Sequence, residues 1–381
     1  MFCDHVDGSE ASGGNRLLDE FFLKSNPWDL RELRHRRREM PGQAEALIWI
    51  EEIVDYILQS NTQAYKPRSK AMNGLSESRL GRRLRWAYPL HTLFESQHDY
   101  SEKPAAFLQA CWQVKRQMGQ WINDPDNHRH DVSMDDARAM NMMVELIRQW
   151  AADGMLLKGR QNRRVEHERN GQNAACYVAA VLNRCIQVEV VMLDCYYEGL
   201  ASAHVTIDRA MSDVQDFIQE LDTHRDYHHL AGHVWSIEQC RGDGFHVRIA
   251  LVFNGSRFVE GIDQGCVIGD LWKENVTHGR GRYFICSLTN DRTDGPVIGT
   301  VRLDDELACV DAVRCIQEVF SGGDFLDRDD QYLRIRRKSM YPFGTGPLPD
   351  VTGNECGLSA DPVPWLEACM VGSHTKGNAL S

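Results

Sequence analysis

Glu238 and His246 are the residues whose types and spacing best suit chemistry in this chain of 381 residues. They flank a short turn, CRGDG, inside the segment 235–254. A hairpin centred on Gly242 places Glu238 opposite His246 on neighbouring antiparallel strands, with their Cβ atoms about 5 Å apart. That distance allows the two side chains either to bind one divalent metal ion or to form a hydrogen-bonded pair on a solvated sheet face.

Several short patterns follow one another in a fixed order around this pair. They are Leu193-Asp194 upstream, Glu238-Gln239 before the turn, His246 and an apolar run ending at Asn254 after it, and FLDRDDQYLRIRRKSMYPFGTG (325–346) downstream. In this order they resemble the YagK/YfjJ family, which is related to the gene-2 product of the filamentous phages (inoviruses). The resemblance covers about residues 186–346.

The resemblance implies a protein similar to the HUH-type rolling-circle replication initiators and relaxases. In such enzymes paired histidines and a third ligand, often Glu, hold Mg²⁺ or Mn²⁺, which polarises the scissile phosphate of single-stranded DNA. A tyrosine attacks this phosphate and forms a phosphotyrosine bond that conserves the energy for rejoining. By this resemblance, Glu238 and His246 are metal ligands. The implied partners are single-stranded DNA at a phage origin and host replication proteins.

Two positions that this chemistry needs are substituted in the chain. Arg248, which faces Ser236 in the same hairpin, stands where the second histidine is expected, and a guanidinium that stays protonated cannot bind a metal. Phe325 stands at the position of the nucleophile, and Arg328 at that of the lysine that follows it. Together these changes indicate a diverged initiator with impaired or lost cleavage, in which Arg248 contacts a phosphate directly.

Tyr332 is the alternative nucleophile. If residues 324–334 form a helix, Tyr332 lies seven positions after Phe325 on the same face, about 10 Å along the axis. The family also carries an aromatic residue near this place, so a packing role for Tyr332 is the competing interpretation.

Other histidines offer weaker candidate sites. His128 and His130 follow Asn-Asp-Pro-Asp-Asn, which is typical of a loop, and His278 lies in a short THGRG segment. A further cluster, more typical of a helix-to-strand loop than of a metallohydrolase site, comprises His224, His228, His229 and His233. The sequence has neither a Walker A motif nor a G-x-S-x-G motif, so nucleotide hydrolysis and α/β-hydrolase chemistry lack support.

The elements that position these residues fall into two regions. Residues 17–160 are predicted to be helical, with apolar residues at i, i+3 and i+4 in 43–59, 105–122 and 134–152. Ser133 is a suitable N-cap for the last of these. The polar stretch that follows, 158–173, is interpreted as a linker.

Residues 186–346 are predicted to form an α+β domain with a central antiparallel sheet, HUH/RRM-like by the resemblance, and helices on one face. Its strands are expected at 188–197, 230–240 and 245–253, and its helices at 206–222 and 303–320. Residues 1–15 are predicted to be disordered, and 347–381 to form a loose tail.

Composition restricts the class of protein. No apolar run is long enough to span a membrane, no secretory signal is recognisable, and the twelve cysteines form no C-x-x-C pair. These features favour a cytoplasmic protein with reduced thiols. The net charge is −12, but residues 31–90 carry +5, in clusters that include Arg36, Arg37, Arg82 and Arg83. Such clusters are either solvated helix faces or contacts for DNA phosphates.

The function predicted from these observations is rolling-circle replication initiation in a phage or prophage, by metal-assisted nicking and joining of single-stranded DNA. The alternative is a non-catalytic, DNA-binding descendant that regulates phage replication. A third possibility is a phage accessory protein that acts through protein contacts alone.

Overall fold

The computed structural model describes residues 41–67, 74–118, 133–224, 229–255, 261–286, 299–321, 332–339 and 341–349. The described residues from Gly42 onward belong to one compact unit. The prediction of disorder over 1–15 lies outside the described residues, as do Arg36, Arg37 and all but residues 347–349 of the loose tail predicted over 347–381.

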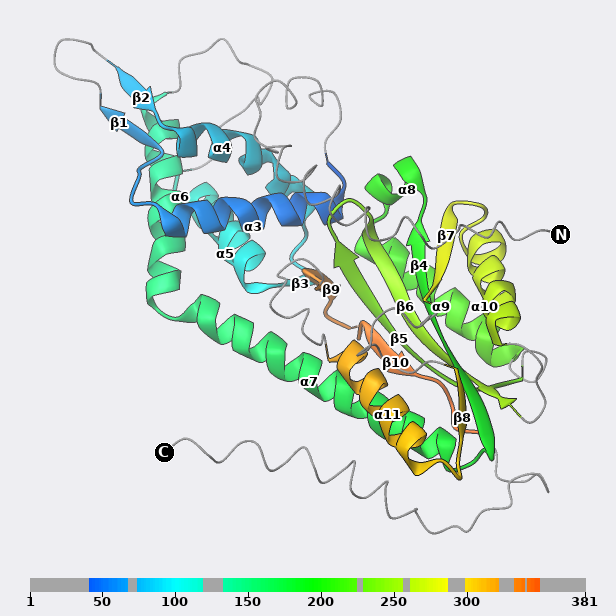
Figure 1. Cartoon of the computed structure of the whole chain (residues 1–381). Coiled ribbons are helices and arrows are strands. Elements are labelled where there is room, and N and C mark those ends of the chain that lie inside the picture. The colour runs from blue at the N-terminus through cyan, green and yellow to red at the C-terminus, as the bar shows by residue number, and fades with distance from the viewer. Residues whose placement is uncertain are drawn as a thin grey trace, which may run out of the picture. The chain divides into compact units, whose positions relative to one another are not determined.

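The first half of the described chain is helical, as predicted (Figure 1). Its main helices are α3 (Gln43–Gln59), α4 (Arg79–Ala87), α5 (Glu102–Met118), α6 (Met134–Ala152) and α7 (Met155–Leu182). The predicted helix at 43–59 is confirmed, because its apolar stripe is buried against α4, α5 and α6. The N-cap of α6 is also confirmed: Ser133 and Asp136 form a reciprocal capping box.

Helix α7 shows that the linker interpretation of 158–173 is wrong. A left-handed residue, Gly154, separates α6 from α7, and the chain then continues as one helix of 28 residues. The polar residues of its first half face solvent or form ion pairs, such as Arg164 with Glu168 one turn away at 2.9 Å. A polar helix that is anchored by its buried C-terminal half therefore resembles a linker in sequence.

The second half of the chain builds a six-stranded sheet in which neighbouring strands pair antiparallel. The strand order is β10–β5–β6–β4–β7, and β8 also pairs with β4. The strands are β4 (Gln187–Tyr197), β5 (Leu230–Cys240), β6 (Gly244–Asn254), β7 (Gly281–Cys286), β8 (Thr300–Arg302) and β10 (Phe343–Thr345). The three predicted strands therefore share one antiparallel sheet, and the α+β class is confirmed.

The register of the central hairpin matches the prediction. Glu238 pairs with His246 and Ser236 with Arg248 between β5 and β6. The neighbouring strand β4 brings Asp194 opposite Arg248 from the other side. Three adjacent strands thus direct charged side chains to one face of the sheet.

Helices cover both faces of the sheet rather than the one face that was predicted. On one face α7 and α11 (Glu306–Phe320) pack against Val190 and Met192 of β4. On the other, α9 (Ile207–Thr223) contacts β6, and α10 (Gly261–Asp270) contacts β4 at Val191. The reason is that β4 is apolar at consecutive positions, so each of its faces needs a cover.

Two small antiparallel pairs lie apart from the six-stranded sheet. The strand β1 (Tyr65–Pro67) pairs with β2 (Leu75–Glu77) before α4. The strand β3 (His98–Tyr100) pairs with β9 (Ile335–Arg337), which joins the helical half to a segment near the C-terminal end of the described chain.

Candidate functional site

The centre of the predicted site is an ion-pair network. Arg248 donates from Nε and Nη2 to the two carboxylate oxygens of Asp194 at 2.9 and 3.2 Å. Its Nη1 lies 3.2 and 3.3 Å from the carboxylate oxygens of Glu238. The side chains of Arg248 and Glu238 are only 18% and 15% exposed, so this network is largely shielded from solvent. One guanidinium therefore bridges two carboxylates from neighbouring strands.

His246 continues this network on the same face of the sheet. Its Nε2 lies 3.3 Å from Glu238 Oε2, and its Nδ1 lies 3.7 Å from the sulfur of Cys240. The imidazole ring stacks on Tyr196, with ring centroids 4.9 Å apart. The two ring nitrogens thus face different partners on opposite sides of the ring.

The electrostatics of the network keep Glu238 and His246 charged. Burial alone would raise the pKa of Glu238, but the Arg248 guanidinium and His246 hold it below its usual value. Burial alone would lower the pKa of His246, but Cys240 and Glu238 raise it to about 10. His246 is therefore an imidazolium at neutral pH, and it forms a buried ion pair with Glu238.

The residues of this network do not fit the divalent metal ion that the resemblance implies. His246 Nε2 and Arg248 Nη1 contact the same oxygen of Glu238, Oε2. A guanidinium therefore lies against the carboxylate oxygen that a metal ion would share with His246. Within the described ranges, no three side chains of His, Cys, Asp or Glu come together in a group able to hold a metal. A protein cation takes the place of a metal cation between these carboxylates.

Arg248, which was predicted to contact a phosphate, forms hydrogen bonds with carboxylates of the protein instead. Its Nε, Nη1 and Nη2 each point at a carboxylate oxygen of Asp194 or Glu238. Asp194 entered the sequence analysis only as part of a family pattern, and its pairing with Arg248 across β4 and β6 was missed.

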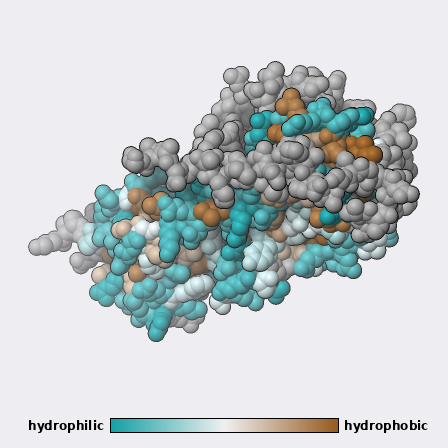
Figure 2. Space-filling model, turned by 90° about the horizontal axis from the view of Figure 1, so that it is seen from below, coloured by the Kyte–Doolittle hydropathy of each residue, from teal (hydrophilic) through white to brown (hydrophobic). Residues whose placement is uncertain are grey.

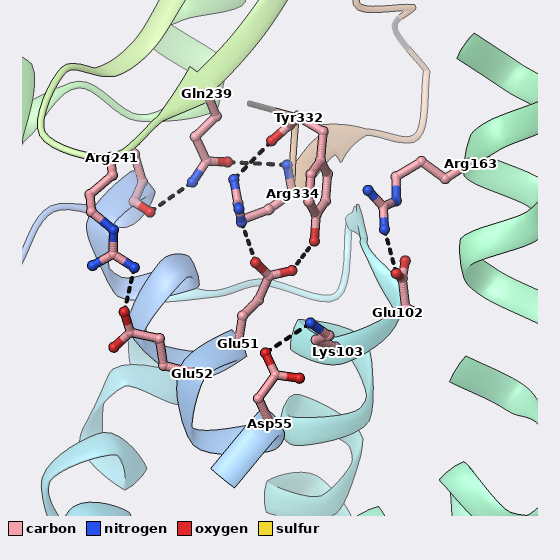
Figure 3. Close-up of polar contacts among 11 residues, drawn as sticks. Glu51, Glu52, Asp55, Glu102, Lys103, Arg163, Gln239, Arg241, Tyr332 and Arg334 are labelled. Carbon is pink, nitrogen blue, oxygen red and sulfur yellow. Dashed lines mark hydrogen bonds and ion pairs between the residues drawn. The ribbon is translucent and has the colours of Figure 1, made fainter. Parts of the chain in front are cut away.

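Tyr332 lies in a second buried polar cluster, between α3 and β5 (Figure 3). Its hydroxyl donates to Glu51 Oε1, and Arg334 Nε donates to the other oxygen of the same carboxylate at 2.5 Å. The Arg163 guanidinium stacks on the phenol ring at 3.6 Å. Burial and the Glu51 carboxylate raise the pKa of the Tyr332 phenol. These contacts suit a structural role, in which Tyr332 is held between α3 and α7, rather than the role of a nucleophile.

Gln239 connects this cluster to the hairpin (Figure 3). Its Nε2 donates to the backbone oxygen of Ala44 at 2.7 Å, and its Oε1 accepts from the backbone nitrogen of Arg334 at 3.1 Å. The amide that follows Glu238 therefore fixes α3 and the chain near Arg334 to β5. Glu51 and Arg334 were missed in the sequence analysis, although a glutamate inside the apolar stripe of α3 was an available signal.

Of the remaining predicted residues, Phe325 and Arg328 lie outside the described residues. Arg82 is exposed on α4, 3.7 Å from Glu77, whereas Arg83 lies over the ring of Tyr56 at 4.3 Å. Arg82 is thus placed for contact with a ligand in solution, and Arg83 is packed against the helical core.

The other histidines do not form a common site among the residues that the structure covers. His233 is buried and bonds to Asp222 at 2.9 Å, and His224 lies 3.5 Å from Glu220. His229 and His278 have left-handed backbone conformations in turns. His128, His130 and His228 lie outside the described residues.

A cavity of about 350 Å³ lies between α5, α7 and residues 333–336. Its lining includes Arg163 and Arg336, which pair with Glu102 and Glu166 respectively. Burial and Arg163 hold the pKa of His167, another lining residue, below its usual value. The arginines of this cavity are thus balanced by acidic neighbours.

The surface and the comparisons add three findings. No described helix is both long and apolar enough to cross a bilayer. On the face seen in Figure 2, the coloured residues are mostly hydrophilic, with smaller hydrophobic areas between them.

In comparisons with known proteins, no family model, curated protein or solved structure matches this chain. The resemblance to the YagK/YfjJ family therefore stays a prediction.

Proposed function

We propose that the protein binds single-stranded DNA without cleaving it, in the cytoplasm of a bacterial host. It is a descendant of a phage replication initiator and acts as a regulator of phage replication. The observation that carries this proposal is the Arg248 guanidinium, which pairs with Asp194 and Glu238. Because that guanidinium already balances the carboxylates, the site needs no metal ion for its charge balance. Unlike a metal ion, a guanidinium has no coordination position through which it could polarise a phosphate.

The position of Tyr332 supports the same proposal. A tyrosine nucleophile must reach the scissile phosphate and lose its proton during the attack. The Tyr332 hydroxyl is instead buried against Glu51, whose carboxylate disfavours the phenolate. Releasing it would require opening the contact between α3 and the segment at Arg334.

The surface of α4 supports the binding part of the proposal. Arg79 and Arg82 are exposed on this helix, three positions apart and therefore on one face. Lys66, on the preceding strand β1, is exposed as well. Exposed guanidinium and ammonium groups suit DNA phosphates, and each contact releases condensed counterions from the nucleic acid.

The test is the salt dependence of single-stranded DNA binding, measured by fluorescence anisotropy on the full chain. We expect affinity to fall as salt rises, with a slope that decreases by about 1.4 in the double variant Arg79→Gln with Arg82→Gln. The matched control, Arg302→Gln with Arg314→Gln, removes the same charge from exposed arginines near and on α11 and should leave the slope unchanged.

Two outcomes would overturn the proposal. Wild-type protein without salt-dependent binding would favour a function through protein contacts alone. Equal losses in the two double variants would mean that only net charge matters, and that α4 is not the contact surface.

A further inference from the structure

Helix α5 turns a polar and aromatic face toward solvent beside α6. Its opposite face, which includes Phe107, Cys111 and Val114, is buried in the helical core. Four residues of the outward face follow the helical spacing i, i+3, i+4 and i+7 from Gln109. With one residue of α6, this face lines an open groove of about 550 Å³. The described lining comprises Gln109, Trp112, Gln113, Arg116, Gln117 and Trp150.

Two tryptophans supply the apolar surface of the groove. Trp112 is 37% exposed, although tryptophan is one of the residue types that proteins mostly bury. Trp150, from the C-terminal end of α6, is half-buried. An indole has a flat face on which another planar ring can stack. The groove therefore offers a stacking surface that is accessible from solution.

The polar side chains of the groove indicate which planar ring it fits. Each of the three glutamine amides has both donors and an acceptor, as the edge of a nucleobase does. Arg116 is exposed, and it is the one charged group among the lining residues that the structure describes. Its guanidinium suits a phosphate, and the described lining contains no carboxylate that would repel one. Aromatic rings beside a cation are the groups with which proteins hold single-stranded nucleic acids.

We propose that this groove binds unpaired bases of single-stranded DNA, with a base stacked on Trp112 and a phosphate against Arg116. The inference rests on the proposed function, to which it adds a site for the bases beside the phosphate contacts of α4. A peptide helix fits the groove less well, because four of its six described lining residues are polar. An apolar helix face would leave their amides and the guanidinium without partners.

The cavity between α5 and α7 extends the same surface. It shares Gln109 and Trp150 with the groove, so the two adjoin at these residues. Its lining adds two further neutral amides, Asn162 and Asn170, and its arginines are balanced by acidic neighbours. A second base can therefore lie next to the first and find donors and acceptors there.

The experiment compares two labelled oligonucleotides of equal length by fluorescence anisotropy with the full chain. One is an oligothymidylate, and the other has the same phosphates with abasic sites in place of the bases. We expect the wild type to bind the oligothymidylate about tenfold more tightly. Trp112→Leu should reduce this preference to near one, because it removes the stacking surface. Its salt slope should not change, because no charge is lost.

Two further variants serve as controls. Phe284→Leu removes another exposed aromatic ring, on β7, and should keep the full preference for bases. Arg116→Gln should also keep the preference but lower the salt slope by about 0.7, as expected for one phosphate contact on a single strand. The two variants thus separate base stacking from surface hydrophobicity and from charge.

Equal affinity of the wild type for the two oligonucleotides, with salt dependence intact, would overturn this inference and leave the proposed function standing. A preference that persists in Trp112→Leu would place the bases outside the groove. If the same variant also changed the oligomeric state in sedimentation, the groove would instead be an interface between two copies of the chain. No salt-dependent binding of either oligonucleotide would overturn the proposed function and this inference together.

Discussion

At the scale of single residues, Arg248 explains why the sheet site is charged yet stable. Its guanidinium bridges Asp194 and Glu238, which would otherwise be two shielded carboxylates side by side. Removing it leaves both without their main counter-charge. We expect Arg248→Met to lower the free energy of unfolding by about 3 kcal/mol or more, measured by urea denaturation.

The control for Arg248 is Arg302, which makes a two-pronged pair with Asp304 on the surface. The side chains of Arg302 and Asp304 are both well exposed, so solvent screens their interaction. Arg302→Met should therefore change stability much less than Arg248→Met. Similar losses in the two variants would mean that the sheet network contributes no more than a surface ion pair.

His246 predicts a pH dependence of stability. Its pKa is raised to about 10 in the folded protein, above the value of about 6.5 expected for an unfolded chain. The stabilisation is complete below the unfolded pKa and is lost as pH rises through the folded one. We expect this group to cost the wild type up to about 1.4 kcal/mol per pH unit between these values.

Urea denaturation near neutral pH and again in mild alkali measures this loss. His246→Gln cannot titrate, so its stability should change less with pH than that of the wild type over the same interval. Equal pH dependence in the two proteins would mean that the Glu238–His246 ion pair is not formed.

The sequence allowed part of this site to be predicted. Symmetry about Gly242 placed Glu238 opposite His246, because a two-stranded hairpin is a local structure. The partners from other elements could not be predicted in the same way. Asp194 comes from β4, and Glu51 meets Tyr332 across 281 positions of sequence, so only the tertiary fold brings them together.

At the scale of elements, the contact between α7 and α11 depends on a glycine. A Cβ atom at Gly171 would lie 2.6 Å from the Gln317 backbone oxygen and 2.5 Å from Ser321 Cβ. Backbone at that distance cannot move aside without shifting a helix. We expect Gly171→Ala to destabilise the protein by about 1 to 3 kcal/mol in thermal or urea unfolding, despite the better helix propensity of alanine.

Asn173, two positions further along α7, is exposed and provides the control. Asn173→Ala should leave stability unchanged or raise it slightly, by a few tenths of a kcal/mol. A Gly171→Ala protein as stable as Asn173→Ala would show that α7 and α11 are not in close contact there.

The elements themselves could be predicted where periodicity was strong. The apolar stripe of α3 and the alternation in β6 predicted their bounds to within a residue or two. Helix α7 could not be predicted in this way, because its first half carries few apolar residues. The helices on both faces of the sheet could not be predicted either, because a strand that is apolar at consecutive positions does not show which elements pack on it.

At the scale of the whole molecule, the two halves of the chain share polar connections as well as a long helix. Gln239 ties β5 to α3, and Arg334 joins the same cluster from the segment before β9 (Figure 3). This cluster also holds Tyr332, so freeing a nucleophile would break a connection between the halves. This cost is one of the two arguments for the proposal of binding without cleavage.

The most direct test of that claim is covalent capture. Fluorescently labelled single-stranded DNA that binds the wild-type protein by anisotropy is incubated with the same sample and Mn²⁺, then separated on a denaturing protein gel. Binding without cleavage predicts intact DNA and no fluorescence on the protein band. A labelled protein band in the wild type that disappears in Tyr332→Phe, but persists in the exposed-tyrosine control Tyr341→Phe, would contradict the account and make Tyr332 the nucleophile.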